Sequence, residues 1–229
     1  MTHTDVSDVG RPIVLIPLGS YEQHGPHLPP DTDTLIAEWL CRAAAERIGN
    51  QTDGIRCLVT PPIGIGASGE HSGFTATLSV GSGVLADALV EIARSADWAA
   101  RLVFVNGHGG NHDAINVARR IIESEKRPVD FWSPRGPGGG DLHAGHVETS
   151  VMMAIRPDAV RRERIVRGPD TGATDLVPVL RTRGVRAVSS NGVIGDPSRA
   201  DAAAGRTILD SWLVDLCGVL GSHSGSTRT

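Results

Sequence analysis

The chain has 229 residues, of which 40% are hydrophobic and only 3% aromatic, and its formal net charge is -4. This length suits one α/β domain with a mainly aliphatic core, expected to span 1–229 with flexible ends at 1–10 and 221–229. The acidic charge excludes a basic surface for nucleic acid, and no apolar run is long enough for a transmembrane helix.

Short apolar runs alternate with longer segments that carry apolar residues on one side. The short runs predict strands buried on both faces, and the longer segments predict amphipathic helices. In chain order, we expect a strand at 12–18, a helix at 34–48, a strand at 57–60, a helix at 84–100, a strand at 102–105, a helix at 111–124, a strand at 129–132, and helices from about 145 to before Pro157 and at 200–216. This order predicts a three-layer α/β/α fold with a mainly parallel central sheet.

Histidines gather in Gly-rich segments rather than in the predicted core. Seven of the nine fall in four short segments, around 24–27, 71, 108–112 and 143–146. The loops 19–33 and 106–111 each follow a predicted strand, so both are expected at the carboxyl edge of the sheet, where ligands bind in such folds. The pattern therefore indicates a functional site at that edge.

The first candidate cluster combines carboxylates with an imidazole. Glu22 and His24 are two residues apart, so an extended backbone would point both to one side. Asp33 follows and could bridge two ions through its two oxygens. Mixed oxygen and nitrogen ligands suit zinc, manganese or iron. The alternative is a polar turn whose side chains bond to the backbone.

Three further segments carry candidate residues. His108 directly follows a buried strand among glycines that allow a ligand to approach the backbone, although a phosphate-binding turn is the alternative. His143 and Glu148 stand at a predicted loop-to-helix junction, which could also be a capped helix with a surface glutamate. The Gly-rich segment 68–74 could line the pocket or form an ordinary turn.

Other hydrolytic chemistries fit the sequence less well. It contains no G-x-S-x-G nucleophile elbow and no H-E-x-x-H helix. Cys41, Cys57 and Cys217 are widely spaced and odd in number, which favours a reducing cytoplasm over a disulfide framework. The start has no signal-peptide pattern, which also favours a cytoplasmic protein.

Taken together, these motifs resemble the creatininase family. The likeness rests on four segments in the family's order, GSYEQHGPHLPPDTD, GASGEHSGF, NGHGGN and DLHAGHVETS, and on NGVIGDP at 191–197. The resemblance implies a creatininase-like fold and a hydrolase that uses two divalent metal ions, zinc or iron with manganese possible. It also implies a homo-oligomer, a hexamer or a related assembly.

The resemblance assigns roles to individual residues. Glu22 and His24 would each bind one ion, Asp33 would bridge the two, and His108 would complete the site of Glu22. Glu148 is the choice for the remaining ligand beside His24. Creatininases carry a glutamate two residues after the NGH histidine, where this chain has Gly110, which argues against creatinine as the substrate.

Further roles follow from the same resemblance. His143 would act as acid or base at the departing amine, and Glu148 would also take part in catalysis. Residues expected to contact the substrate are Ser68, Glu70 and His71. Those expected to hydrogen-bond to the ligands are His27, Asn111, His112 and His146.

Within the family, the HAGHVETS and DTDT stretches are most similar to short members encoded with the mycofactocin pathway. Those members are peptidases that cut a modified C-terminal Val-Tyr unit from a precursor peptide. A formamide or lactam hydrolase with the same metal motifs is the first alternative. A non-catalytic metal- or nucleotide-binding regulatory protein on the same fold is the second.

Overall fold

The computed structural model describes residues 2–8, 10–51, 56–135, 141–170 and 172–222. Its centre is a four-stranded sheet in which all neighbouring strands pair in parallel, in the order β2-β1-β3-β4. The strands are β1 (Ile13–Leu18), β2 (Cys57–Val59), β3 (Arg101–Asn106) and β4 (Val129–Trp132).

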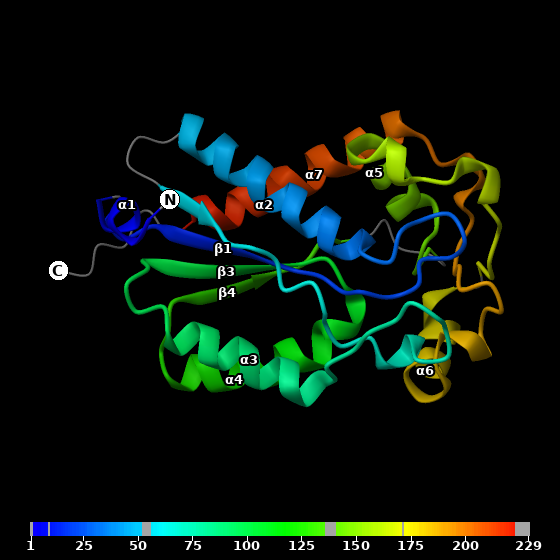
Figure 1. Ribbon diagram of the computed structural model, residues 1–229, viewed down its shortest axis with the longest axis horizontal. Helices are drawn as coiled ribbons and strands as arrows, with labels where there is room; N and C mark the ends of the chain where they lie inside the picture. The colour runs from blue at the N-terminus through cyan, green and yellow to red at the C-terminus, as the bar shows by residue number, and fades with distance from the viewer. Residues whose placement is uncertain (1, 9, 52–55, 136–140, 171, 223–229) are drawn as a thin grey trace.

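Helices cover both faces of the sheet (Figure 1). On one face lie α2 (Thr32–Gln51), α5 (His146–Ile155) and α7 (Ala202–Gly221), and on the other lie α3 (Ser82–Arg94) and α4 (His112–Ser124). A hydrophobic core lies on each face of the sheet. Alternate residues of a strand pack into one core or the other, because successive side chains point to opposite faces. Thus Leu15 and Val103 pack toward α2, whereas Val14 and Phe104 pack toward α3.

The predicted α/β/α architecture with a parallel sheet is confirmed, and each predicted strand and helix is present within a few residues of its expected bounds. The predicted helix 84–100 is too long, because α3 ends at Arg94 and is followed by turns. Residues 1–10 were expected to be flexible, but the structure forms α1 (His3–Asp8) there, with no buried residue. Most of the predicted flexible end 221–229 lies outside the described residues.

Besides α1, one further α-helix of the described residues was not predicted from the sequence. It is α6 (Ala173–Arg183), which contains Pro178, a residue that ordinarily interrupts a helix. Within the described residues, no helix combines the length and the apolar character that crossing a bilayer requires.

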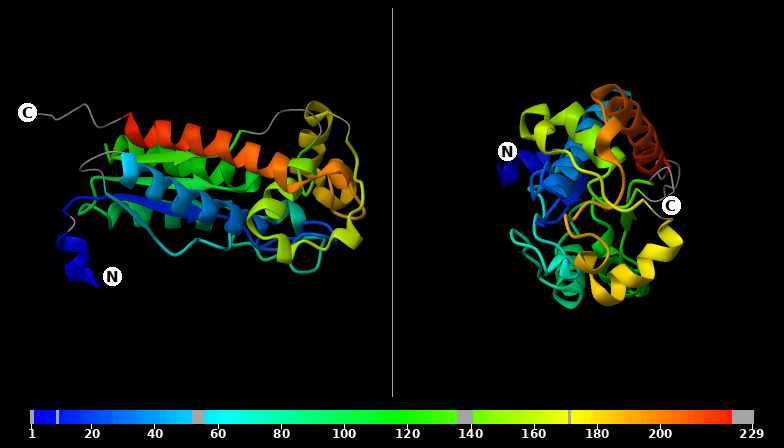
Figure 2. Two further views of the ribbon diagram at one scale, coloured as in Figure 1. Left: turned by 90° about the horizontal axis from the view of Figure 1, so that it is seen from above. Right: turned by 90° about the vertical axis from the view of Figure 1, so that its right-hand side faces the viewer.

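The loops that follow β1 and β3 meet at one end of the molecule, opposite α1 and the end of α7 (Figures 1 and 2). They pack closely there: a Cβ at Gly107 would collide with the main-chain oxygen of Asp33. Glycine at this position therefore lets the loop after β3 reach the first turn of α2, and this contact brings the candidate residues together.

Candidate metal centre

Carboxylates and imidazoles from five segments converge at this end of the sheet. They come from the loop after β1, the first turn of α2, the short 3-10 helix Gly69–His71, the loop after β3, and the segment leading into α5. The converging side chains are Glu22, His24, Asp33, Glu70, His71, His108, His143 and Glu148. Glu70 and Glu148 are partly exposed, and the other six are buried.

Two of the possible ligand groups share Asp33. One combines Glu22, Asp33 and His108, and the other combines His24, Asp33 and Glu148; within each group the donor atoms lie within 4.8 Å of one another. His108 Nδ1 is 3.0 Å from Asp33 Oδ2, and His24 Nε2 is 3.2 Å from Asp33 Oδ1. Each oxygen of Asp33 thus faces a different histidine, as a carboxylate that bridges two ions would.

The surroundings of Glu22 fit a metal ligand. Both carboxylate oxygens are buried, and neither has a hydrogen-bond partner within the described part of the chain. Buried polar atoms without partners are rare, and a bound ion is one of the few explanations. Burial raises the pKa of Glu22 to about 7. A divalent ion at this position would satisfy both oxygens and hold the group ionised.

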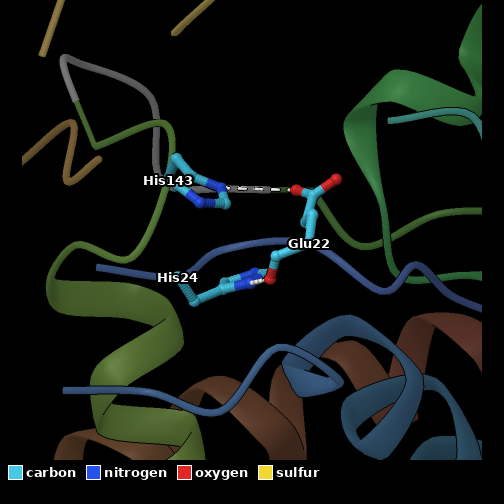
Figure 3. A group of neighbouring side chains, drawn as sticks. All are labelled: Glu22, His24 and His143. Carbon is cyan, nitrogen blue, oxygen red and sulfur yellow. Dashed lines mark hydrogen bonds and ion pairs between the residues drawn. The ribbon is translucent and has the colours of Figure 1, made fainter. Parts of the chain in front are cut away.

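Hydrogen bonds orient the side chains of His24 and Asp33 within the cluster. His24 Nδ1 lies 3.0 Å from the main-chain oxygen of Glu22, which can only accept, so Nδ1 carries the proton (Figure 3). His24 Nε2 therefore faces Asp33 and Glu148, and on losing its proton it would offer its lone pair to an ion held there. The Ser20 hydroxyl donates to Asp33 Oδ2 at 2.7 Å. Such outer contacts commonly fix the orientation of metal ligands.

Glu148 is held by the start of α5. The amide of Ala144 donates to Glu148 Oε2 at 2.6 Å, and Ala144 has a φ of 51°, which is unusual for a residue with a side chain. Asp141 accepts hydrogen bonds from the amides of His146 and Val147 and so caps the helix. The capped turn presents Glu148 3.8 Å from His24 Nε2.

His143 and Gln23 complete the inner wall. His143 Nε2 lies 2.7 Å from the Gln23 main-chain oxygen and therefore donates to it, which leaves Nδ1 as an acceptor 3.7 Å from Glu22 Oε1 (Figure 3). The Gln23 side-chain nitrogen is also 3.2 Å from His143 Nε2, but both are then donors, so the carbonyl is the true partner. Burial lowers the pKa of His143 well below its usual value and keeps the ring neutral.

Gln23 was not predicted as a site residue, yet its side chain lies 2.9 Å from His71 Nδ1 and donates to the Gly192 carbonyl. The signal for Gln23 in the sequence was its position between Glu22 and His24. Side chains alternate along an extended segment, so Gln23 points to the side opposite these two residues and can contact a different part of the site. It orients His71, whose Nε2 lies 3.1 Å from Glu22 Oε1.

The two histidines nearest Asp33 have raised pKa values. Burial alone would lower the pKa of His24, but the charge of Asp33 and a hydrogen bond to it raise it to about 10. For His108, the charge of Glu22 and a hydrogen bond to Asp33 likewise outweigh burial and raise the pKa to about 10. Burial likewise opposes the charged form of Asp33, but His24 and His108 hold its pKa well below the usual range. The cluster therefore attracts positive charge at the positions that the ions would take.

The cluster opens into a pocket of about 860 Å³. Glu70 and His71 line it, whereas Ser68, also expected to contact substrate, is buried and lies outside the lining. Two of the residues predicted to hydrogen-bond to the ligands bond to other groups instead. His27 pairs with the Thr149 hydroxyl, and Asn111 joins the Gly19 carbonyl to the Ala67 amide.

Two more residues of that predicted set lie near the surface. His112 is exposed on the pocket wall and its ring bonds to the Gly109 carbonyl. His146 is partly buried at the start of α5, where its amide bonds to Asp141. In the described part of the chain, neither ring has a hydrogen bond to a candidate ligand.

Glu70 occupies the space in front of Gly110. A Cβ at Gly110 would collide with Glu70 Oε1 and with His108 Nε2, whereas a Cβ at Gly109 would meet nothing within 4 Å. We therefore expect Gly110→Ala to displace one of these side chains and to lower kcat/KM by about 10–100-fold, the loss typical of disturbed ligand support. Gly109→Ala is the matched control and should stay within about twofold. Equal activity of the two variants would show that the side chains in front of Gly110 can move aside without loss.

Comparisons with known proteins identify the family of this chain. The family model described as "Creatininase: Creatinine amidohydrolase" matches residues 1–220. The "Mycofactocin precursor peptide peptidase" of Mycobacterium ulcerans (strain Agy99) is 50% identical over 209 residues, covering 90% of this chain and 83% of that protein.

Solved structures share the fold. A manganese creatininase has a TM-score of 0.78 at 26% identity and covers 96% of this chain and 95% of its own. A mutant creatininase in a Zn-Zn form has a TM-score of 0.76 at 25% identity, with the same coverage. The predicted resemblance and the predicted class of hydrolase acting on C–N bonds are confirmed, and the chain belongs to the creatininase family of metal-dependent amidohydrolases.

Proposed function

We propose that this protein is a two-metal peptidase that releases the modified C-terminal Val-Tyr unit of a ribosomally made precursor peptide. The observation that carries the proposal is the pair of ligand groups sharing Asp33 beside a pocket of about 860 Å³. The mycofactocin peptidase that is 50% identical to this chain supports the choice of a peptide as substrate. Zinc, iron and manganese all suit such mixed ligands.

The residues of this chain would have separate roles in binding metal, transferring protons and positioning the peptide. Glu22, Asp33 and His108 would hold one ion, and His24, Asp33 and Glu148 the other. When bound, the ions would lower the pKa of a water molecule and polarise the scissile carbonyl. His143 would take a proton from the attacking water at Nδ1 and return it to the departing amine, because Nε2 is already engaged by the Gln23 carbonyl. Glu70 and His71 would position the peptide at the pocket wall.

Metal affinity should depend steeply on pH. Burial raises the pKa of both Glu22 and Glu148 to about 7, and each must lose its proton to bind a metal. Each proposed ion site contains one of these carboxyls, so as the pH falls from 8 to 6 we expect the affinity for zinc at each site to fall by about tenfold in total, most of it below pH 7. Competition with a chromophoric chelator would measure this, and an affinity that stays constant over the range would refute it.

The proposed activity can be tested directly. Metal-loaded protein would be incubated with a precursor peptide ending in Val-Tyr, crosslinked or not, and the products followed by mass spectrometry. We expect release of the two-residue unit, abolished by a chelator and by His108→Ala. If the peptide stays intact while the metals are shown to be bound, the peptidase proposal fails and a small-amide hydrolase becomes the better assignment.

We also propose a cytoplasmic homo-oligomer, with a hexamer as the expected assembly. Exposed apolar side chains on neighbouring segments support an interface: Tyr21 and Leu78 pair across an antiparallel bridge, and Val80 and Val84 follow. Burying such surface between copies stabilises association. Light scattering that gives the mass of one 24.0 kDa chain would contradict this assembly.

A further inference from the structure

We infer that an apolar wall of the pocket binds the side chains of the two residues that leave on cleavage. The inference rests on the proposed function and assigns the specificity element of that same pocket. The ligand that this surface fits is uncharged and apolar, such as a branched aliphatic side chain followed by an aromatic ring. The apolar wall consists of five pocket-lining residues, Leu142, Val177, Leu180, Val185 and Ile194.

Part of the apolar wall is open to the pocket. Val177 is 36% exposed, and Leu142 and Leu180 are partly buried. Leu142 and Leu180 pack against a buried cluster that includes Val185 and Ile194, so the wall has a close-packed apolar base. Val177 and Leu180 are three residues apart on α6 and are therefore neighbours on its surface. An apolar side chain that covers this surface removes it from water, which favours binding.

The apolar wall is held in place from two sides. The amides of Leu142 and His143 donate to the Ile194 carbonyl at 2.9 and 3.1 Å, and the Ile194 amide donates to the His143 carbonyl at 2.8 Å. At the other side α6 ends at Gly184, where a Cβ would lie 2.8 Å from the main-chain oxygen of Glu70 (Figure 1). The wall is thus fixed beside the metal centre, and a preformed site loses little conformational entropy when a ligand binds.

The position of His143 indicates which side of the cut the apolar wall receives. In the proposed function His143 returns a proton to the departing amine, so the released residues lie next to it. Leu142 directly precedes His143 and packs with Ile194. Two extended residues span only about 7 Å, so both released side chains remain within a pocket of about 860 Å³. The wall therefore faces the residues that leave rather than those that stay with the precursor.

The charged groups of the pocket lining are either part of the metal centre or exposed to water. Four of the lining carboxylates belong to the candidate ligand groups. The fifth, Asp113, is 70% exposed and lies 4.0 Å from Arg181, which is 69% exposed, and exposed pairs of this kind contribute little. The five residues of the apolar wall carry no charge. This side of the pocket therefore favours an uncharged ligand.

The test measures the binding of two small probes to the full metal-loaded chain by titration calorimetry. In the first probe, valine is joined by an amide bond to phenethylamine. In the second, valine is joined to β-alanine amide, which replaces the aromatic ring with a polar carboxamide. Both probes have one free amine and no carboxylate, so they differ in the apolar group alone.

The variants are Val177→Thr, Leu180→Asn and the double substitution. Threonine keeps the branched shape of valine and adds a hydroxyl. Val214→Thr is the matched control, because Val214 is also a helical valine, is 56% exposed on α7, and lies outside the pocket lining of the described chain.

For the wild type and Val214→Thr, we expect the aromatic probe to bind about 10–100-fold more tightly than the carboxamide probe, as the burial of one large apolar side chain provides. Its binding should also show a negative heat-capacity change, which marks apolar burial. For the double variant, the two affinities should agree within about threefold. The KM for the crosslinked precursor peptide should rise by about tenfold in this variant, with metal content unchanged.

Equal affinity of the two probes for the wild type, or no measurable binding of the aromatic probe, would overturn the inference. So would a preference for the aromatic probe that survives in the double variant, because a purely structural role of Val177 and Leu180 would weaken both probes together. Cleavage of the crosslinked precursor tests the proposed function separately. If the precursor is cleaved and the probes bind equally, only the role of the apolar wall fails. If the probes bind as expected and the precursor stays intact, the peptidase proposal fails and the wall still binds an apolar amine.

Discussion

Replacing Asp33 with alanine is expected to remove both metal ions at once. Asp33 is the one side chain shared by the two ligand groups, and each of its oxygens lies within 3.2 Å of a different histidine. Metal ions supply several kcal/mol of transition-state stabilisation, so their loss should lower kcat/KM by about 1,000-fold or more. Elemental analysis should find metal content falling from about two ions per chain to near zero.

Two further variants make this result specific. Asp33→Asn keeps the shape of the side chain and an acceptor for the Ser20 hydroxyl, so it tests the charge without opening a cavity. Asp31→Ala removes a carboxylate two residues away that belongs to no ligand group, and should keep both ions. Loss of only one ion from Asp33→Ala would show that the aspartate does not bridge. Full metal content would exclude it as a ligand.

Sequence patterns predicted the sheet because its strands are short apolar runs that must be buried on both faces. A run such as Leu102 to Val105 is apolar on both sides, and only a central parallel strand buries both faces. The helices that pack on the sheet repeat their apolar residues at the expected period. By contrast, α6 contains Pro178 and packs on a small separate cluster with Val185 and Ile194. Its helical state depends on tertiary contacts that no local pattern records.

The residues of the candidate site likewise divide into those that local motifs predict and those that meet only through tertiary contacts. Motifs identified Glu22, His24 and His108 because each follows or lies close to the end of a buried strand. They could not show that Glu70 fills the space before Gly110, since the two residues are 40 positions apart and meet only through loop packing. Nor could they show Gln23 against His71, or Arg183 on the pocket wall.

Replacing His143 should lower turnover while leaving the metals in place. Its Nε2 donates to the Gln23 carbonyl, so the free Nδ1 faces the pocket, and burial lowers its pKa and keeps the ring neutral, with a lone pair at Nδ1. Loss of a general acid or base typically costs about 10²–10⁴-fold in rate. We expect His143→Gln to lower kcat by that factor and to change KM little.

The competing role for His143 is that of a ligand, because it also forms a possible metal group with Glu22 and His24. The two roles predict different metal contents. His143→Gln can still donate to the Gln23 carbonyl but cannot accept and return a proton, so a catalytic role predicts low kcat with both ions retained. A ligand role predicts that an ion is lost together with activity. Because Nδ1 lies 3.7 Å from Glu22 Oε1, whereas the two groups that share Asp33 already provide three side chains for each ion, we expect the first result.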